Sequence, residues 1–185
     1  MKFLVFIVFV LAAIIVTMFF VRSGSVSPET ANPPQHAYVS WDTMEFDKCV
    51  SFWLIKRFID KDAQFAFVPQ NTEIQEGVPF DIPGAKWSRG HLKCTSQCIL
   101  ESIPHPDAAL EKIVSIAAKT ELNFWQLDHW PDAQKCFYEV KKITDIAASP
   151  AECFEKTRPY FDRLYDEFKK DAKLNTETKQ EDKTQ

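Results

Sequence analysis

The chain has 185 residues, of which 45% are hydrophobic, 26% charged and 14% aromatic, a composition typical of globular proteins and not of disordered ones. The formal net charge is −4 and no basic stripe occurs, which argues against nucleic acid as a partner. Only four Gly are present, which argues against a glycine-rich phosphate-binding loop.

An apolar segment lies at the N-terminus. Residues 3–21 are hydrophobic with Thr17 as the one polar exception, and Lys2 and Arg22 flank them. As a helix this segment would be about 28 Å long, close to the hydrocarbon thickness of a bilayer. A helix satisfies its backbone groups internally, as lipid requires. The sequence therefore predicts one N-terminal transmembrane helix over residues 1–22, with residues 3–21 in membrane lipid.

A cleaved signal peptide is the alternative interpretation of the same segment. Ser23, Gly24 and Ser25 are small enough for a peptidase, and cleavage near Ser25 would give a secreted protein. The apolar stretch exceeds the usual signal core of about 7–15 residues, which favours a retained single-pass anchor. Both interpretations place the globular part outside the cytoplasm, on the periplasmic side in a Gram-negative cell.

The rest of the chain divides by composition into three parts. Residues 23–36 are rich in Ser, Pro and Asn and are predicted to be a flexible linker, whereas residues 173–185 are predicted to be a disordered polar tail. Residues 37–172 remain as one globular domain of about 135 residues. Sixteen Phe and five Trp are enough to fill its core.

The first half of this domain combines a helix with short strands. Residues 46–59 carry apolar side chains at almost every turn, which predicts a helix buried on much of its circumference. Asp47 is its expected N-cap, and Asp42 marks an alternative start. Strands are predicted at residues 65–68, at residues 78–82 and around residues 85–88, with Pro83 and Gly84 as a turn between the last two.

The second half is helical. Helices are predicted at residues 94–101, from Pro106, from Pro131, and after the capping box at residues 149–152. The last helix is expected to bend or break near Pro159, because proline removes a backbone hydrogen bond. The predicted fold class is therefore α+β and helix-dominated, with a small sheet of about three short strands packed on several helices.

Five cysteines are present, and they show no metal-binding spacing. Because the number is odd, they cannot all pair within one chain. In an extracytoplasmic domain one or two disulfides can form; the alternative is that the cysteines are buried thiols that pack as small apolar side chains.

Four stretches resemble the chromate-resistance ChrB family. Residues 47–60 read DKCVSFWLIKRFID, similar to the family's DRxxSAWLIRRFID. Residues 78–85 read VPFDIPGA, similar to IPFDxxGA, and Cys94-Thr95 resembles the start of the CT(F)E segment. Residues 160–168 resemble the closing YDALYxW. The resemblance, to the C-terminal or exported chromate-resistance domain, spans about residues 47–168 and marks this chain as a divergent member.

The resemblance implies a link to chromate or metal-stress resistance. In the family's regulators this domain follows a second half, in place of which this chain has the predicted membrane helix. The usual His-Arg-Gly-Asp-Arg-Cys string is replaced by the sequence of residues 89–94, a usual carboxylate is replaced by Lys119, and the pair after the Thr is Ser96-Gln97. A polar site built on those positions would be altered here.

Lys56 and Arg57 are candidates for binding an oxyanion. Chromate is a tetrahedral dianion, and a guanidinium group can bind two such oxygens at once. The alternative is structural: Arg57 would pair with a nearby carboxylate to organise the fold, while Lys56 would point to water. The carboxylates considered for this pairing are Asp60, Asp62 and Asp81.

His91 and Cys94 are the second pair of candidates. Cys94 and Cys98 share a helix face, and a thiolate at a helix start has a lowered pKa, so these residues could bind a soft metal or reduce chromate. The alternative is that both cysteines are buried and structural. Trp53 is expected in the core, and Asp47, Asp60 and Asp81 are expected to position the candidates.

No catalytic motif occurs in the sequence, which argues against an enzyme. The sequence also identifies no cofactor, no metal and no protein partner. The leading hypothesis is a membrane-anchored ChrB-like domain that acts by binding an oxyanion or a metal. The alternatives are a degenerate, non-catalytic interaction module of the cell envelope and, third, a thiol-dependent reductase.

Overall fold

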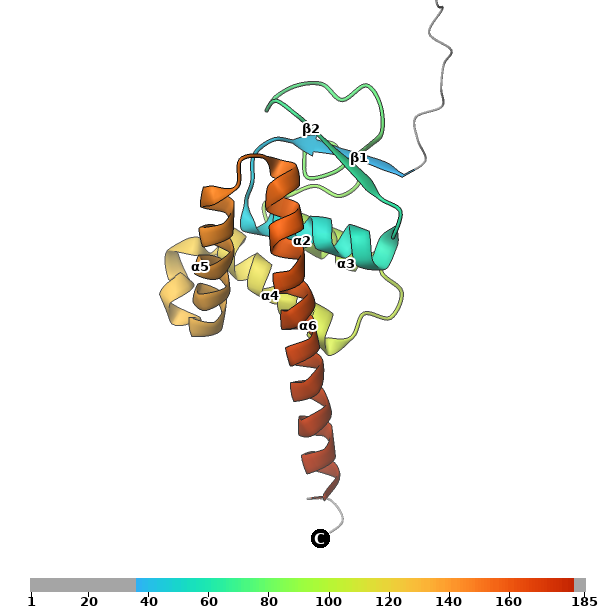
Figure 1. Ribbon diagram of the computed structural model, residues 1–185. Helices are drawn as coiled ribbons and strands as arrows, with labels where there is room; N and C mark the ends of the chain where they lie inside the picture. Colours follow the sequence, from blue (N-terminus) through green and yellow to red (C-terminus); the bar gives the residue numbers. More distant parts are fainter. Residues whose placement is uncertain (1–35, 182–185) are drawn as a thin grey trace, which may run out of the picture. The chain divides into compact units, whose positions relative to one another are not determined.

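A computed structural model of the chain describes residues 36–181, with side chains as far as Leu174. The predicted transmembrane helix and residues 23–35 of the linker lie outside the described residues. Within residues 36–181, no helix is long and apolar enough to cross a bilayer. Figure 1 shows a helix-dominated domain with a small sheet. The sheet has three strands, so the predicted α+β fold class is confirmed for this part of the chain.

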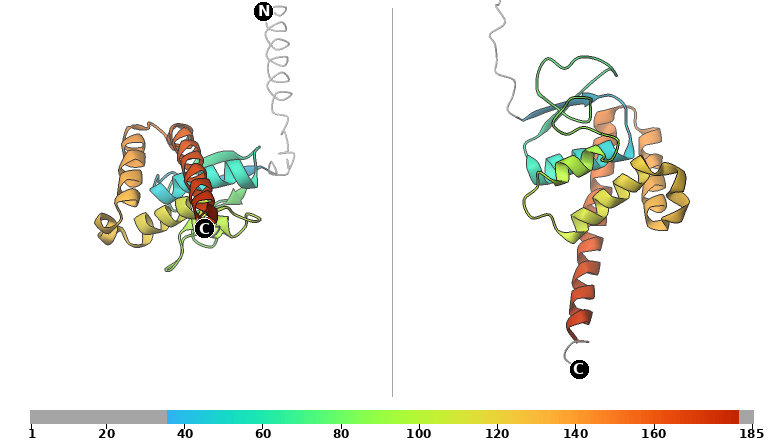
Figure 2. Two further views of the ribbon diagram at one scale, coloured as in Figure 1. Left: turned by 90° about the horizontal axis from the view of Figure 1, so that it is seen from below. Right: turned by 180° about the vertical axis from the view of Figure 1, so that it is seen from behind.

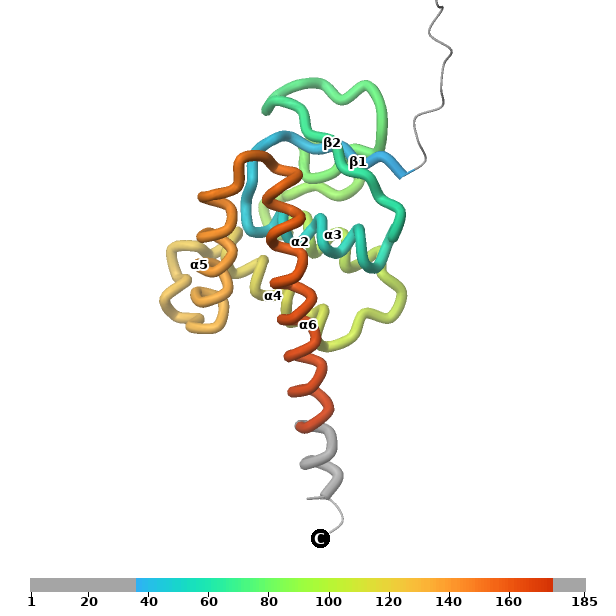
Figure 3. The backbone as a smooth tube through the Cα atoms, in the orientation of Figure 1, coloured from blue at the N-terminus to red at the C-terminus, as the bar shows by residue number. Residues whose placement is uncertain are grey.

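The elements alternate between strands and helices only at the start. In chain order they are β1 (Ala37–Trp41), α2 (Phe46–Leu54), the π-helical turn η1 (Ile55–Ile59), β2 (Gln64–Val68), β3 (Val78–Pro79), α3 (Thr95–Leu100), α4 (Ala108–Leu122), the 3₁₀ helix η2 (Phe124–His129), α5 (Pro131–Ile146) and α6 (Pro150–Glu181). Figure 3 traces the long connection between β2 and α3, in which β3 is the one regular element.

The sheet has the order β2-β1-β3, and both outer strands run parallel to β1. Ala37 pairs with Gln64 and Trp41 with Val68, while Tyr38 pairs with Val78. The helix α2 forms the crossover that a parallel pair requires between β1 and β2. The central strand β1 is therefore the element that defines the sheet, and the sequence pattern did not predict it.

The third predicted strand is wrong. Residues 85–88 contribute a single bridge, between Trp87 and Phe80, and form no strand of their own. Pro83 and Gly84 do form the predicted turn, in which the Ala85 N–H donates to the Ile82 carbonyl at 3.2 Å, but the turn does not join two strands. The indole ring of Trp87 is buried and stacks on Tyr38 with ring centres 6.3 Å apart.

The helix α2 lies at the centre of the core. All nine of its residues are buried, as the wide apolar arc predicted. The sheet lies over one side of α2, while α4 and α6 contact its other sides (Figure 1). Phe52 links these layers, because its ring is within 4.8–5.3 Å, centre to centre, of the rings of Phe65, Phe67, Phe80 and Phe154.

The helix α6 continues through Pro159, so of the predicted bend or break the break is wrong. Proline leaves the carbonyl of Glu155 without its helical partner, but Glu155 and Pro159 lie on the exposed face, where water can satisfy that oxygen. The backbone remains helical to Glu181, beyond the boundary at residue 173 that the polar composition predicted. Figure 2 shows η2 and α5 packed together beside α4 at one end of the domain.

Candidate functional site

Asp47 caps a neighbouring helix and not its own. Its carboxylate accepts hydrogen bonds from the backbone N–H groups of Thr95, at 2.8 Å, and Ser96, at 3.2 Å, in the first turn of α3. The N-cap of α2 is Glu45, without a side-chain bond, so the predicted capping role of Asp47 and the alternative start at Asp42 are both wrong. Burial raises the pKa of Asp47 above its ordinary value, although the hydrogen bond from Ser96 opposes that shift.

Lys48 is a buried cation that the sequence analysis did not single out. Its side chain is 1% exposed, and Nζ donates to the carbonyl of Trp41 and to Oγ1 of Thr43, each at 2.9 Å. Nζ also lies 3.3 Å from Oδ2 of Asp81, whose Oδ1 accepts the Thr95 hydroxyl at 2.5 Å. All three ammonium donors therefore have acceptors, as a buried cation requires.

The residues that carry the family resemblance converge at this point. Asp47 and Lys48 come from the first motif, Asp81 from the second and Thr95 from the third. Together they connect α2, the segment after β3 and the start of α3. Because each charged atom already has a partner, we interpret this cluster as structural: a ligand could enter only by breaking these bonds.

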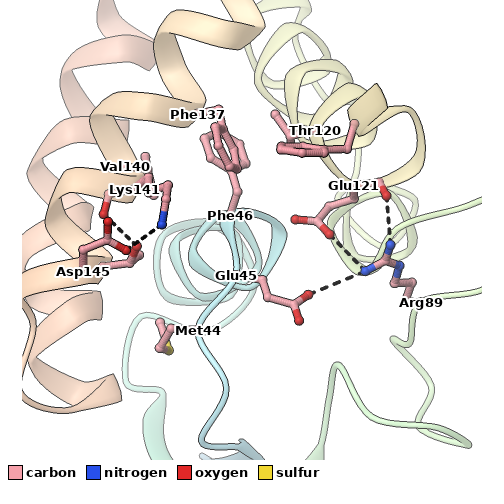
Figure 4. A pocket seen from close by; sticks show the side chains of 12 residues that line it. Met44, Glu45, Phe46, Arg89, Thr120, Glu121, Phe137, Val140, Lys141 and Asp145 are labelled. Carbon is pink, nitrogen blue, oxygen red and sulfur yellow. Dashed lines mark hydrogen bonds and ion pairs between the residues drawn. The ribbon is translucent and has the colours of Figure 1, made fainter. Parts of the chain in front are cut away.

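Glu121 connects the buried cluster to the surface. Its Oε1 accepts the Asp47 N–H at 3.3 Å, and its Oε2 lies 3.0 Å from Nη1 of Arg89. Arg89 also donates to the backbone carbonyl of Glu121 at 2.8 Å and lies 3.5 Å from Glu45 (Figure 4). Burial, followed by the charge of Asp47, raises the pKa of Glu121 to about 7. Glu121 can therefore change its protonation state near neutral pH.

A cavity of about 420 Å³ lies next to Glu121. Phe46, Phe124 and Phe137 supply apolar surface, and the Lys141–Asp145 ion pair, 2.8 Å long, faces Arg89 from the opposite side (Figure 4). The cavity can hold a small molecule that has an apolar body and a charged group. Sequence patterns did not predict it, because Glu121 lies 74 positions from Asp47 along the chain.

A second, basic cleft of about 320 Å³ lies between η1 and α6. Four cationic side chains and one carboxylate line it together with Trp53: Lys56, Arg57, Lys61, Arg158 and Asp162. Arg57 is ion-paired with Asp162 and lies 3.9 Å from Asp166, so the predicted pairing with Asp60, Asp62 or Asp81 is wrong. Its guanidinium also stacks over the Tyr165 ring, 4.8 Å from the ring centre.

The other residues around this cleft are held by the fold. Trp53 is 1% exposed, and its Nε1 donates to Oδ1 of Asp162 at 2.8 Å. Nζ of Lys56 donates to the carbonyl of Ala63 at 2.8 Å, so the expectation that it points freely into water is wrong. Asp60 binds His36, with 2.7 Å between Oδ2 and Nδ1, and so does not position Arg57. The sequence analysis did not single out Lys61 and Arg158, because they lie far apart in the chain and only the fold brings them to one cleft.

The structure does not bring His91, Cys94 and Arg57 together. His91 is exposed in the loop before α3, whereas Cys94 is fully buried, with Sγ 3.3 Å from the Ser96 hydroxyl. Burial, together with the charge of Asp47, raises the pKa of Cys94 to about 12, so the predicted low pKa is wrong. Within the described residues, no three His, Cys, Asp or Glu side chains are grouped so as to hold a metal ion.

Comparison with known proteins supports the motif-based resemblance. The family described as ChrB, C-terminal domain, matches residues 38–168, which is most of the chain and nearly all of the described domain. Neither the curated proteins nor the solved structures contain a match. The family match covers all four motif stretches, including the residues of the buried cluster around Lys48. The chain therefore belongs to the ChrB C-terminal domain family, which is associated with chromate resistance.

Proposed function

We propose that this protein is a membrane-anchored domain that binds chromate, or a tetrahedral dianion of the same shape, in the basic cleft between η1 and α6. The observation that carries the proposal is the excess of positive charge there: four cationic side chains and one carboxylate line the cleft. A partly enclosed group of cations attracts a dianion and offers several donors to its oxygens.

The cleft is partly preorganised. Asp162 and the stacking on Tyr165 hold the Arg57 guanidinium in place, and its side chain is still 35% exposed. Lys61 is exposed, and among the described residues the ion-pair partner of Arg158 is the surface carboxylate of Glu155, at 3.1 Å. Such surface pairs contribute little, so Arg158 can turn toward an anion at small cost. Lys61 and Arg158 would supply charge, while Arg57 would supply orientation.

The membrane anchor is the second part of the proposal. It rests on the apolar segment of residues 3–21, which is long enough to span a bilayer, and on the linker that follows it. A linker of residues 23–36 extends at most about 50 Å, so the anchor would keep the domain close to the lipid surface. The cleft would then meet anions at the outer side of the membrane.

Calorimetric titration of the full chain in detergent micelles with chromate tests the binding site. We expect Arg158→Gln and Lys61→Gln each to weaken chromate binding about tenfold, because each removes one charge-assisted contact. Arg163→Gln removes the same charge from the exposed face of the same helix, outside the cleft, and is the matched control. An unchanged affinity in both cleft variants, or no binding by the parent protein, would contradict the proposal.

A second candidate, the non-catalytic interaction module, is favoured by one observation. Phe124, Trp125 and Tyr138 are 53%, 73% and 51% exposed, and such rings are common in protein interfaces. A photo-crosslinking residue placed at Trp125 should then give one discrete adduct in cells, while the same residue at the exposed Lys170 should not. Anion binding without any adduct at Trp125 would reject this candidate.

A further inference from the structure

Cys49 and Cys153 bring their sulfur atoms into contact from distant parts of the chain. Cys49 lies in α2 and Cys153 in the first turn of α6, 104 positions later, and their Sγ atoms are 3.8 Å apart. Both residues are fully buried in the core, where α2 and α6 pack against each other.

The other three cysteines have different surroundings. Sγ of Cys94 lies near Ser96 and Gln97, and Sγ of Cys98 contacts the Ser88 carbonyl at 3.6 Å. Cys136 lies beside Tyr160. All five cysteines belong to the described part of the chain, and within it the contact between Cys49 and Cys153 is the single contact between two sulfur atoms.

We propose that Cys49 and Cys153 are a site of disulfide cross-linking, which a disulfide-type oxidant such as oxidised glutathione closes. A disulfide bond is about 2.05 Å long, so the two sulfur atoms must approach by roughly 1.8 Å. Rotation of the two side chains and a small shift between helices can supply such a distance. The proposal concerns these thiols alone and does not depend on anion binding.

The cross-link would join the two walls of the basic cleft. Arg57 follows Cys49 by two helical turns, and Arg158 follows Cys153 by little more than one. A covalent bond between these helices therefore limits how far the cationic groups can separate. It also restricts the unfolded chain, because the closed loop includes most of the domain.

The reaction proceeds by two thiol–disulfide exchanges. The Cys153 thiolate attacks one sulfur of oxidised glutathione, whose S–S bond breaks and releases one glutathione thiolate. The Cys49 thiolate then attacks Sγ of Cys153, breaks the mixed disulfide and releases the second glutathione. Two electrons and the two thiol protons leave the protein, and two molecules of reduced glutathione form.

Once the core has closed, the contact makes the two thiols unequal. The hydrogen bond between the two sulfur atoms, in which either thiol can donate, lowers the pKa of Cys153 and raises that of Cys49. Because both sulfur atoms are enclosed, the oxidant reaches them during folding, before the core closes.

Refolding of the full chain from denaturant into detergent micelles, with oxidised or with reduced glutathione, tests the proposal. After alkylation under denaturing conditions, we expect five modified thiols in the reduced sample and three in the oxidised one. Peptide mapping should assign the missing pair to Cys49 and Cys153. The melting temperature of the oxidised protein should rise by about 10 °C, and dithiothreitol should reverse the rise.

Single variants provide the controls. Cys136→Ser should keep the cross-link, whereas Cys49→Ser and Cys153→Ala should each leave four thiols that alkylate fully. Five alkylated thiols in a refolded, helical parent protein, or a cross-link that maps to another pair, would overturn the proposal. The same peptide mapping on protein taken from cells tests the predicted location separately from the disulfide. If the two cysteines oxidise in the test tube but are reduced in cells, that result contradicts the extracytoplasmic placement and leaves the disulfide proposal intact.

Discussion

The Asp47 carboxylate, near the start of α2, accepts the backbone N–H of Thr95, the first residue of α3, at 2.8 Å. A buried carboxylate from α2 therefore adds to the local cap of α3, in which Oε1 of Gln97 accepts the Cys94 N–H at 3.0 Å, and the two helices are joined where three motif stretches meet. Removing the carboxylate would leave two buried N–H groups without an acceptor, since Ser96 uses it too.

We expect Asp47→Ala to lower the free energy of unfolding by about 3 kcal/mol, and Asp47→Asn, which keeps one acceptor, by about 1 kcal/mol. Urea denaturation followed by circular dichroism measures both values. Ser149→Ala is the comparison, because Ser149 caps α6 in an exposed position and its loss should cost about 1 kcal/mol. Equal losses for Asp47→Ala and Ser149→Ala would show that burial of the cap does not matter.

Lys48→Met should be destabilising, by about 3 kcal/mol, because it places an apolar group beside the partly buried Asp81 carboxylate, whose side chain is 13% exposed, and leaves that carboxylate without its cation. Lys56→Met is the control: Lys56 has one hydrogen bond, to Ala63, and is half-buried, so about 1 kcal/mol is expected. Chemical denaturation of a double variant with Asp81→Asn should give a loss smaller than the sum of the single losses. Strict additivity would mean that the two side chains do not interact.

Stability should fall as the pH rises through the range in which Glu121 titrates. The pKa of Glu121 is raised from 4.5 to about 7 in the folded protein, so between these values the folded state binds more protons than the unfolded state. The contribution is complete below pH 4.5 and is lost as the pH approaches and passes 7. It amounts to about 3 kcal/mol at most.

Denaturation of the parent protein and of Glu121→Gln between pH 4.5 and 8 measures this contribution. The parent protein should lose more stability than the variant across the range, because the neutral amide does not titrate. Asp47, whose pKa is also raised, contributes in the same direction in both proteins; because its charge acts on Glu121, the difference between the profiles reports Glu121 together with its coupling to Asp47. Parallel pH profiles would contradict a raised pKa for Glu121. Glu139→Gln, at the surface, should leave the profile almost unchanged.

Arg57→Ala should weaken the fold as well as anion binding. The change removes the ion pairs with Asp162 and Asp166 and the stacking on Tyr165, which together should cost about 1–2 kcal/mol at this partly exposed position. Arg57→Lys should recover little, because an ammonium group neither stacks nor binds in bidentate fashion. Thermal unfolding measures the loss, and an unchanged melting temperature in Arg57→Ala would leave binding as its only role.

The membrane anchor predicts the behaviour of the full chain in cell fractions. The protein should stay in the membrane pellet after an alkaline carbonate wash, and deletion of residues 2–22 should release it into the soluble fraction. N-terminal sequencing of the membrane form should begin at Met1 or Lys2. Recovery of a chain that starts near Ser25 without detergent would instead establish the cleaved signal peptide.

The helices were predictable because each carries its own periodic signal. The apolar arc of α2 and the Pro-initiated start of α5 each appear within a single stretch of sequence. The strands were predictable only in part. The pattern of residues 65–68 predicted β2, but no pattern predicted β1. A central parallel strand is buried on both faces, so its sequence does not show the alternation of apolar and polar residues that indicates a strand.

The candidate site depends on pairings that no local pattern reveals. Arg57 lies close in sequence to Asp60 and Asp62, yet its partner is Asp162, which lies on the face of α6 that packs beside η1. Glu121, in the last turn of α4, pairs with Arg89 from the loop before α3, and Lys61 and Arg158 share a cleft only because α6 packs beside η1. Proximity in sequence is a weak guide to the partner of a long charged side chain.

The sequence by itself determined the family, the helix-dominated fold class and the apolar N-terminal segment, since all three follow from local motifs and periodicity. The tertiary structure alone decided which charges are buried and paired. Lys48 is enclosed because α2 is covered on all sides, and its position in sequence does not reveal that. Burial and pairing are properties of several packed segments at once, so they emerge only when the chain is folded.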